Sequence, residues 1–255
     1  QPVFKHILSL NCLHLGGPNQ IKKASRMIKV AMDSGQYRYM IRTDIESYYS
    51  SINQSILKKA IQGIFKDPRV VKYLSSIIEY VVDDGGDMYR PKRGIPRKSS
   101  MSSFFAALYL KPLDDLLTGK QDVFYLRYND DILILCKSKS QFAKCKRKLN
   151  NTLTKLYLRK ASSKTRMGEI KKGFHYLGIN YAVTQIQHDK IQVDVSVHER
   201  TLHRARLKLQ KQAVTGTPVK VQCYLDRWAS WWSRVLPDSE GGKEALLVRM
   251  VDTSR

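Results

Sequence analysis

One pair of adjacent acids in this chain lies between two apolar, β-prone runs. The pair is Asp130-Asp131, within the stretch Phe-Tyr-Leu-Arg-Tyr-Asn-Asp-Asp-Ile-Leu-Ile-Leu. This pattern predicts a hairpin with Asn129, Asp130 and Asp131 at its tip. Adjacent carboxylates raise each other's pKa unless a positive charge lies between them, and Mg²⁺ would supply that charge because it prefers carboxylate oxygens, water and phosphate. An ordinary turn is the alternative, since Asn and Asp are common turn residues.

Other acids in the chain help to judge this pair. Asp44 ends a second short strand-like run, Met-Ile-Arg-Thr-Asp. If it joins the pair in space, three carboxylates on strand tips would hold two metal ions. Asp83-Asp84 precedes two glycines and is expected in a loop, while Asp114-Asp115 follows Pro112, where a helix should restart. Neither of these two pairs is expected to have strands on both sides.

The overall charge indicates the kind of partner. The 255 residues include 45 Lys and Arg against 22 Asp and Glu, a net charge of +23 that is spread along the chain. Such a surface favours polyanions, because neutralised phosphates release their counterions. The hydrophobic content of 42% suffices for a sizeable core in one unit or two closely packed units. Nucleic acid is the expected partner, although ribosomal or histone-like binding would explain the charge equally well.

Cysteine usage and hydropathy bear on the cellular compartment. The four cysteines, at positions 12, 136, 145 and 223, have no CxxC spacing and predict neither a disulfide framework nor a zinc site. They fit a reducing, cytoplasmic compartment. No apolar run approaches the length of a membrane span, and the N-terminal residues lack a signal-peptide pattern, so no membrane partner is expected.

Several short motifs occur in the order found in reverse transcriptases. Tyr49 follows Asp44 by five positions, and Tyr128-Asn-Asp-Asp comes after both. The other three motifs are Gly94-Ile-Pro leading into Ser102 and Ala107-Leu-Tyr-Leu, then Lys164-Thr165, and then Gly173-Phe-His-Tyr-Leu-Gly. The chain resembles this family, and most closely its bacterial retroelement and group II intron types, strongly over residues 38–180 and weakly in the flanks. One motif alone would be weak evidence, whereas five in this order and spacing are specific.

The resemblance implies an α+β right-hand polymerase fold with fingers, a ferredoxin-like palm and a helical thumb. The implied division is a partial fingers region at 1–37, a palm at 38–183 with a fingers insertion at about 53–97, the palm end and thumb at 184–236, and a polar tail at 237–255. Apolar periodicity independently predicts helices over residues 21–32, 54–64, 69–82, 99–110, 139–160 and from 198 onward. It also predicts strands over 179–183 and 191–197.

The activity implied by the resemblance is that of an RNA-directed DNA polymerase. Its partners would be an RNA template, a DNA or RNA primer and dNTPs. Phosphoryl transfer needs alignment and charge neutralisation, which two Mg²⁺ ions would supply, with Mn²⁺ as a possible substitute. Asp44 and Asp130 are the implied bridging ligands and Asp131 the supporting one. The backbone carbonyl of Ile45 would complete a coordination position.

Further residues take substrate roles by the same resemblance. Tyr49 matches the aromatic residue that packs beneath the sugar and excludes a 2′-hydroxyl, and Tyr128 would pack against the primer end. Lys164 would protonate the departing pyrophosphate or stabilise its charge. The alternative for Tyr49 is an ordinary tyrosine of the core, and the alternative for Lys164 is a lysine of the solvated surface. Basic residues near the start of the chain would meet the triphosphate or, equally well, the template backbone: Lys22, Lys23 and Arg26.

The chain departs from the family pattern at two places that bear on substrate binding. Arg97-Lys98 stands where many relatives carry Gln-Gly, and Ser102-Ser103 where they carry Ser-Pro. The absent glycine removes conformational freedom, while the added charges could hold phosphate. Two rival functions stay open: a polymerase-fold enzyme that works without a template or uses NTPs, and a catalytically silent RNA-binding splicing cofactor. Additional domains or protein partners are also left open.

Overall fold

The computed structural model describes residues 6–97, 99, 101–187, 190–236 and 242–251. The chain divides into two compact units, residues 1–17 with 39–167 and residues 18–38 with 168–255. Within the described ranges, no helix is both long and apolar enough to cross a membrane.

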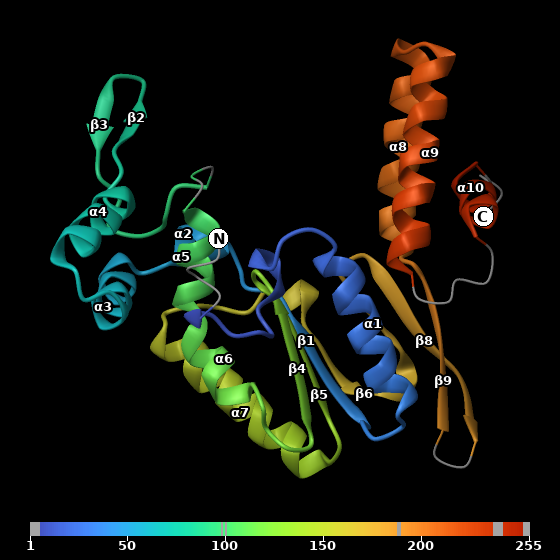
Figure 1. Cartoon of the computed structure of the whole chain (residues 1–255), viewed down its shortest axis with the longest axis horizontal. Coiled ribbons are helices and arrows are strands. Elements are labelled where there is room, and N and C mark those ends of the chain that lie inside the picture. Colours follow the sequence, from blue (N-terminus) through green and yellow to red (C-terminus); the bar gives the residue numbers. More distant parts are fainter. Residues whose placement is uncertain (1–5, 98, 100, 188–189, 237–241, 252–255) are drawn as a thin grey trace. The chain divides into compact units, whose positions relative to one another are not determined.

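The first unit contains β4, β5 and β1 of an antiparallel sheet with the strand order β4-β5-β1-β6, and the boundary between the units falls within β6 (Figure 1). The strands are β4 (Val123–Tyr128), β5 (Asp131–Cys136), β1 (Tyr39–Thr43) and β6 (Arg166–Glu169). From Ile132 to Cys136, β5 is buried throughout, as expected for a central strand. Helix α7 (Lys139–Lys155) packs against β1 and β5 and buries Cys145, Leu149 and Leu153. The expected hairpin is confirmed, but the expected place of Asp131 at its tip is wrong. Asp131 pairs with Tyr128 and begins β5, so the tip consists of Asn129 and Asp130.

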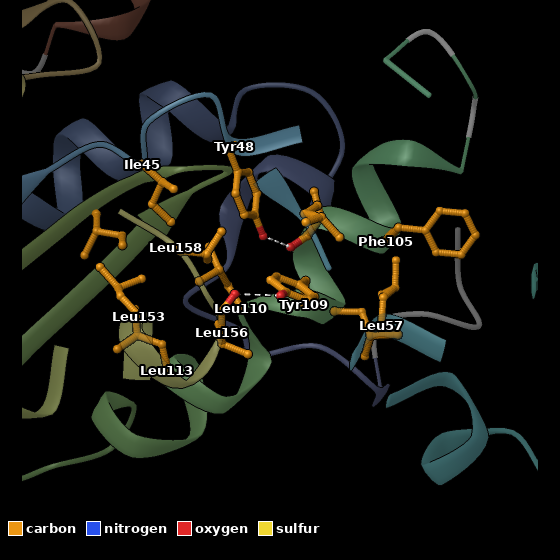
Figure 2. Close-up of a cluster of buried hydrophobic side chains, with 14 of the residues drawn as sticks. Ile45, Tyr48, Leu57, Phe105, Tyr109, Leu110, Leu113, Leu153, Leu156 and Leu158 are labelled. Carbon is orange, nitrogen blue, oxygen red and sulfur yellow. Dashed lines mark hydrogen bonds between the residues drawn. The ribbon is translucent and has the colours of Figure 1, made fainter. Parts of the chain in front are cut away.

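The core of this unit extends beneath the ends of the strands. Figure 2 shows Ile45 and Tyr48 in one apolar cluster with residues of α5 (Ser102–Tyr109). The Tyr48 hydroxyl donates to the Ala106 carbonyl, and the Tyr109 hydroxyl donates to the Leu156 carbonyl. Buried tyrosines need such partners, because an unpaired hydroxyl in an apolar core is costly. The segment after β1 therefore packs on the hydrophobic core through Ile45 and Tyr48.

Helices α3 and α4 agree with the expected periodicity, but α4 is shorter than predicted. Helix α3 spans Gln54–Ile64, and α4 spans Pro68–Ile78 instead of reaching residue 82. The chain after α4 forms a hairpin of β2 (Val82–Asp84) and β3 (Asp87–Tyr89). The expectation that Asp83-Asp84 lacks strands on both sides is therefore wrong. Strands of three residues are too short to show alternation in the sequence.

Two other helices in this unit, α5 and α7, differ at their ends from expectation. Helix α5 begins at Ser102 instead of residue 99. The helix expected to restart near Pro112 is confirmed as α6 (Lys111–Leu117), with Pro112 in its first turn. Helix α7 ends at Lys155 and not at residue 160, because Tyr157 adopts a left-handed conformation with φ 53°. The residues after this turn run beside β1, where the Ala161 amide donates to the Asp44 carbonyl. Among the described residues, this unit also contains the short helix α2 (Tyr48–Ser51) and the 3₁₀ turns η2 (Leu13–Leu15) and η3 (Ser162–Lys164).

The second unit contains an antiparallel sheet of the order β7-β8-β9. Its strands are β7 (Phe174–Tyr176), β8 (Ile179–Gln187) and β9 (Lys190–Val197), which confirm the two predicted strands and lengthen them. Helix α1 (Gln20–Asp33), predicted over 21–32, packs on this unit through Ala24 and Ile28. Helices α8 (Glu199–Thr215) and α9 (Pro218–Val235) pack together. Helix α10 (Lys243–Val251), which the sequence does not predict, buries Leu246 and Met250.

Candidate active site

The strand register brings the acids of two separate segments to one edge of the sheet. Thr43 of β1 lies opposite Ile132 of β5, so the next position, Asp44, stands level with Asp131 at the start of β5. Asp44 and Asp130 both line a cavity of about 480 Å³. The remaining lining residues are Ile45, Ser47, Tyr48, Tyr49, Arg97 and Lys164. Six of the predicted site residues thus share one cavity within the first unit.

Burial raises the pKa of both carboxyl groups of the hairpin, Asp130 and Asp131. Partial burial, followed by the nearby charge of Asp44, raises the pKa of Asp130. Burial raises the pKa of Asp131 to about 6, although the positive charge of Arg42 opposes this shift. The Arg42 Nη2 atom lies 3.5 Å from Asp131 Oδ1. A positive charge in the cavity would favour the ionised form of Asp130.

Asp131 is placed differently from the other two acids. It is absent from the residues that line the cavity, and it faces Arg42 of β1. Arg42 is 8% exposed and also donates to the Lys164 carbonyl at 3.4 Å. Arg42 was not predicted as a site residue, although an arginine in an otherwise apolar strand is a signal that a buried partner exists.

Lys164 reaches one of the cavity carboxylates. Its Nζ atom lies 3.0 Å from Asp44 Oδ2, while its side chain is 56% exposed. The following residue anchors this segment to β1, because the hydroxyls of Thr165 and Thr43 are hydrogen-bonded at 2.8 Å. Lys164 is thus a half-exposed lysine whose ammonium group pairs with Asp44.

The donor set of the cavity fits a hard cation in part. Asp44 and Asp130 supply carboxylate oxygens, and Ile45 also lines the cavity, which suits the oxygen preference of Mg²⁺. In the described part of the chain, no three His, Cys, Asp or Glu side chains form a metal-binding group as they stand. This agrees with the orientation of Asp131 toward Arg42. Water and substrate phosphate would have to complete the coordination of any ion held here.

Tyr49 is fixed by the segment that carries Gly94. The Ile95 amide donates to the Tyr49 carbonyl at 2.9 Å, and Gly94 has φ 88°. A Cβ atom on Gly94 would meet the Ser50 Cα atom at 3.1 Å, so both its conformation and its surroundings favour glycine. The Tyr49 ring packs edge-on against Tyr48 with centroids 5.8 Å apart. Tyr49, for which a sugar-facing role is predicted, is therefore held by the Ile95 amide at its backbone and by Tyr48 at its ring.

Several other predicted residues are not among those that line the cavity. Ser102 is 2% exposed and donates its hydroxyl to the Pro96 carbonyl, so its side chain is used within the fold. Tyr128 lies at the end of β4, with its ring 6.1 Å from that of His14. Lys98 lies outside the described residues. Three basic residues lie on α1 of the second unit: Lys22, Lys23 and Arg26.

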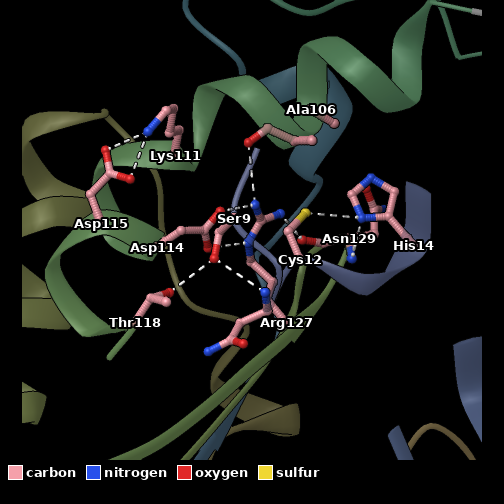
Figure 3. A network of polar contacts seen from close by, with 12 residues as sticks. Ser9, Cys12, His14, Ala106, Lys111, Asp114, Asp115, Thr118, Arg127 and Asn129 are labelled. Carbon is pink, nitrogen blue, oxygen red and sulfur yellow. Dashed lines mark hydrogen bonds and ion pairs between the residues drawn. The ribbon is translucent and has the colours of Figure 1, made fainter. Parts of the chain in front are cut away.

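A buried ion pair supports the hairpin from within the core, and sequence reasoning missed it. Arg127 and Asp114 are both fully buried, and Arg127 donates to Asp114 through Nε at 2.8 Å and Nη2 at 2.5 Å (Figure 3). The Tyr125 hydroxyl also donates to Asp114. Arg127 Nη1 then donates to the Asn129 carbonyl at 2.8 Å. The guanidinium thus holds the peptide that directly precedes Asp130.

A histidine from the start of the chain holds the same turn from the other side. The Asn129 amide donates to His14 Nδ1 at 3.1 Å (Figure 3). The His14 Nε2 atom lies 3.1 Å from the Ser103 carbonyl. Because Nδ1 accepts, Nε2 must carry the proton and donate to Ser103. Burial lowers the pKa of His14 to about 4, which agrees with this neutral ring. No pattern in the sequence singles out His14.

The helices, sheets and hairpin together make an α+β fold. A family model described as reverse transcriptase (RNA-dependent DNA polymerase) matches residues 3–181, and the chain belongs to this family. Protein YkfC of Escherichia coli (strain K12) is 23% identical over 195 residues, which are 62% of this chain and 51% of that protein. This chain therefore spans about half the length of that relative.

The chain is also similar in fold to solved structures of two telomerases. The apo telomerase of Candida tropicalis truncated from the C-terminal domain is similar with a TM-score of 0.57 and 21% identity, over 77% of this chain and 43% of that one. The telomerase of Candida albicans in complex with a TWJ fragment of telomeric RNA has a TM-score of 0.58 and 13% identity, over 94% and 48%. The predicted α+β right-hand polymerase fold is confirmed.

Proposed function

We propose that this chain is an RNA-directed DNA polymerase of the bacterial retroelement type that extends a primer with dNTPs. The observation that carries the proposal is the cavity that gathers Asp44 and Asp130 from separate strand ends beside Tyr49, Arg97 and Lys164. Membership of the reverse transcriptase family supports it. A nucleotidyl transfer site needs this combination of carboxylates, a sugar contact and cations for a triphosphate.

Each residue has a role that its position suggests. Asp44 and Asp130 would hold Mg²⁺, which when bound lowers the pKa of the primer 3′-hydroxyl and offsets the charge of the triphosphate. Arg97 would attract the triphosphate as a permanent cation. Lys164 would give a proton or a positive charge to the departing pyrophosphate, and Tyr49 would pack beneath the sugar. Asp131, held by Arg42, would act as a supporting charge.

Primer extension on a defined RNA template tests this proposal. Each reaction contains Mg²⁺ and either dNTPs or NTPs, and is run with and without the RNA template. In a further set one dNTP is omitted, so that templated synthesis must stop where the template first calls for that nucleotide. Stops at the encoded position, seen only with dNTPs, support RNA-directed DNA synthesis. Products without template or from NTPs would support the rival enzyme instead. Tight, salt-sensitive RNA binding with no product would favour a silent RNA-binding protein, and the polymerase proposal would be withdrawn.

The sugar contact gives a prediction of its own. We expect Tyr49→Ala to increase the use of ribonucleotides relative to deoxyribonucleotides, because the ring that would exclude the 2′-hydroxyl is removed. The ratio of kcat/KM values for the matching dNTP and NTP measures this effect. An unchanged ratio in an active variant would remove the sugar-excluding role from Tyr49.

A further inference from the structure

All four polar groups of Asn129 are engaged at the candidate site. Its backbone amide donates to His14 and its carbonyl accepts from Arg127. Its side-chain Oδ1 accepts from the Tyr49 hydroxyl at 3.2 Å, and its Nδ2 donates to Asp130 Oδ1 at 3.0 Å. One residue of the turn therefore contacts both the candidate metal ligand and the candidate sugar contact.

The direction of the Asn129 amide follows from its two partners. An ionised Asp130 can only accept hydrogen bonds, so the NH₂ group must face it and Oδ1 must face the Tyr49 hydroxyl. An apolar side chain at this position could make neither contact. Asp in the same place could still accept from Tyr49 but could not donate to Asp130 when ionised.

The backbone conformation adds a second constraint. Asn129 has φ 56°, in the left-handed region, where Asn is tolerated better than most residues and Gly best of all. Asn129→Gly would therefore remove the side chain while the turn keeps its conformation and its bonds to His14 and Arg127. This separates the function of the amide from that of the turn.

We infer that Asn129 is a positioning and specificity-determining residue that couples the sugar contact of Tyr49 to the orientation of Asp130. The inference rests on the proposed function and deepens it. The amide holds the Tyr49 ring at a fixed distance from the carboxylate, so sugar discrimination and metal binding depend on one side chain.

A double-mutant cycle tests the hydrogen bond between Asn129 and Tyr49. We expect Asn129→Gly and Tyr49→Phe each to reduce discrimination between dNTP and NTP by about two- to tenfold, the range that one hydrogen bond supplies. The double variant should lose no more than either single one, because both remove the same hydrogen bond. Losses that multiply in the double variant, or an unchanged ratio in Asn129→Gly, would overturn the coupling to Tyr49.

Binding of Mn²⁺ in the absence of nucleic acid, measured by electron paramagnetic resonance, tests the hydrogen bond between Asn129 and Asp130. Asn129→Gly and Asn129→Asp should change the apparent Kd for Mn²⁺ by about two- to tenfold. Asn129→Asp should keep more sugar discrimination than Asn129→Gly, because it can still accept from Tyr49. Equal Mn²⁺ affinity in all three proteins would overturn the positioning of Asp130.

Asn19→Gly is the matched control, because Asn19 also has a left-handed backbone, with φ 65°, and makes no side-chain cap bond. It should leave discrimination and Mn²⁺ affinity unchanged. If the unmutated chain makes no product, the proposed function fails, and the Mn²⁺ titration alone then decides whether Asn129 positions Asp130. If Asn129→Gly does not fold, Tyr49→Phe tests the hydrogen bond between Tyr49 and Asn129, and the isosteric Asn129→Asp tests the hydrogen bond to Asp130.

Discussion

Two hairpins of the first unit carry adjacent aspartates, and they are built in opposite ways. In the β2–β3 hairpin, Asp83 accepts from the amide of Gly86 within its own turn, and the residues of β3 are exposed. In the β4–β5 hairpin, the turn before Asp130 is held by Arg127 on one side and His14 on the other. Adjacent acids alone therefore do not make a site; burial and fixed partners distinguish the second hairpin from the first.

The residues with positive φ show the same difference. Gly85 and Gly86 have φ values of 68° and 105° and bring no side chain to their turn. Asn129 has φ 56° and brings an amide that contacts both Tyr49 and Asp130. A turn built with glycine needs no partners, whereas a turn built with asparagine can use its side chain to organise a site.

The largest effect on stability is expected from breaking the buried ion pair beneath the β4–β5 hairpin. Arg127→Met leaves Asp114 buried without its cation, and we expect a loss of about 3–5 kcal/mol in the free energy of unfolding. Urea denaturation measures this loss. Arg127→Met combined with Asp114→Leu should recover much of the stability but not full primer extension, because the Asn129 carbonyl has still lost its donor. Full synthesis in the double variant would show that the hairpin needs no such support.

A smaller effect is expected from pH, through Asp131. Its pKa of about 6 in the folded protein lies above the ordinary value near 4, so the folded state binds more protons between these values. Stability of the metal-free protein should therefore rise as the pH falls from 7 toward 5, by on the order of 1–2 kcal/mol relative to Asp131→Asn. Urea denaturation at several pH values measures the difference. Parallel pH profiles for the two proteins would contradict the buried, proton-binding state of Asp131.

The smallest effect is expected in the β2–β3 hairpin. Asp83→Ala removes one exposed contact to the Gly86 amide, so the free energy of unfolding should change by less than about 1 kcal/mol. Primer extension should be unchanged. If this variant lost synthesis while it remained folded, the exposed hairpin would belong to the functional machinery, and the contrast between the two hairpins would fail.

Much of the fold was predictable because its signals are local. The β4–β5 hairpin has β-prone runs on both sides of turn residues, and α3 shows apolar residues at helical spacing over its whole length. Helix ends were less predictable, because they depend on distant partners. Helix α7 stops early where the following residues bind beside Asp44, and this contact is not encoded in the periodicity of the helix.

The supporting residues of the site were harder to predict for the same reason. Arg127 stands inside an apolar strand, which signals a buried partner, but nothing in the sequence says that this partner is Asp114. Asp114 was expected only to mark a restarting helix. His14 lies 115 residues before Asn129, and a lone histidine in a short turn carries no signal of its own. Such pairings become visible only when the chain is folded.

Primer extension by Asp130→Asn and Asp83→Asn, side by side with the unmutated chain, tests the central claim most directly. Both variants change one carboxylate of a hairpin acid pair to an amide of the same size. We predict that Asp130→Asn lowers templated synthesis by more than about a hundredfold, because the cavity loses a carboxylate meant for Mg²⁺, while Asp83→Asn stays fully active. Equal activity of the two variants would contradict the assignment of the β4–β5 tip as the catalytic site.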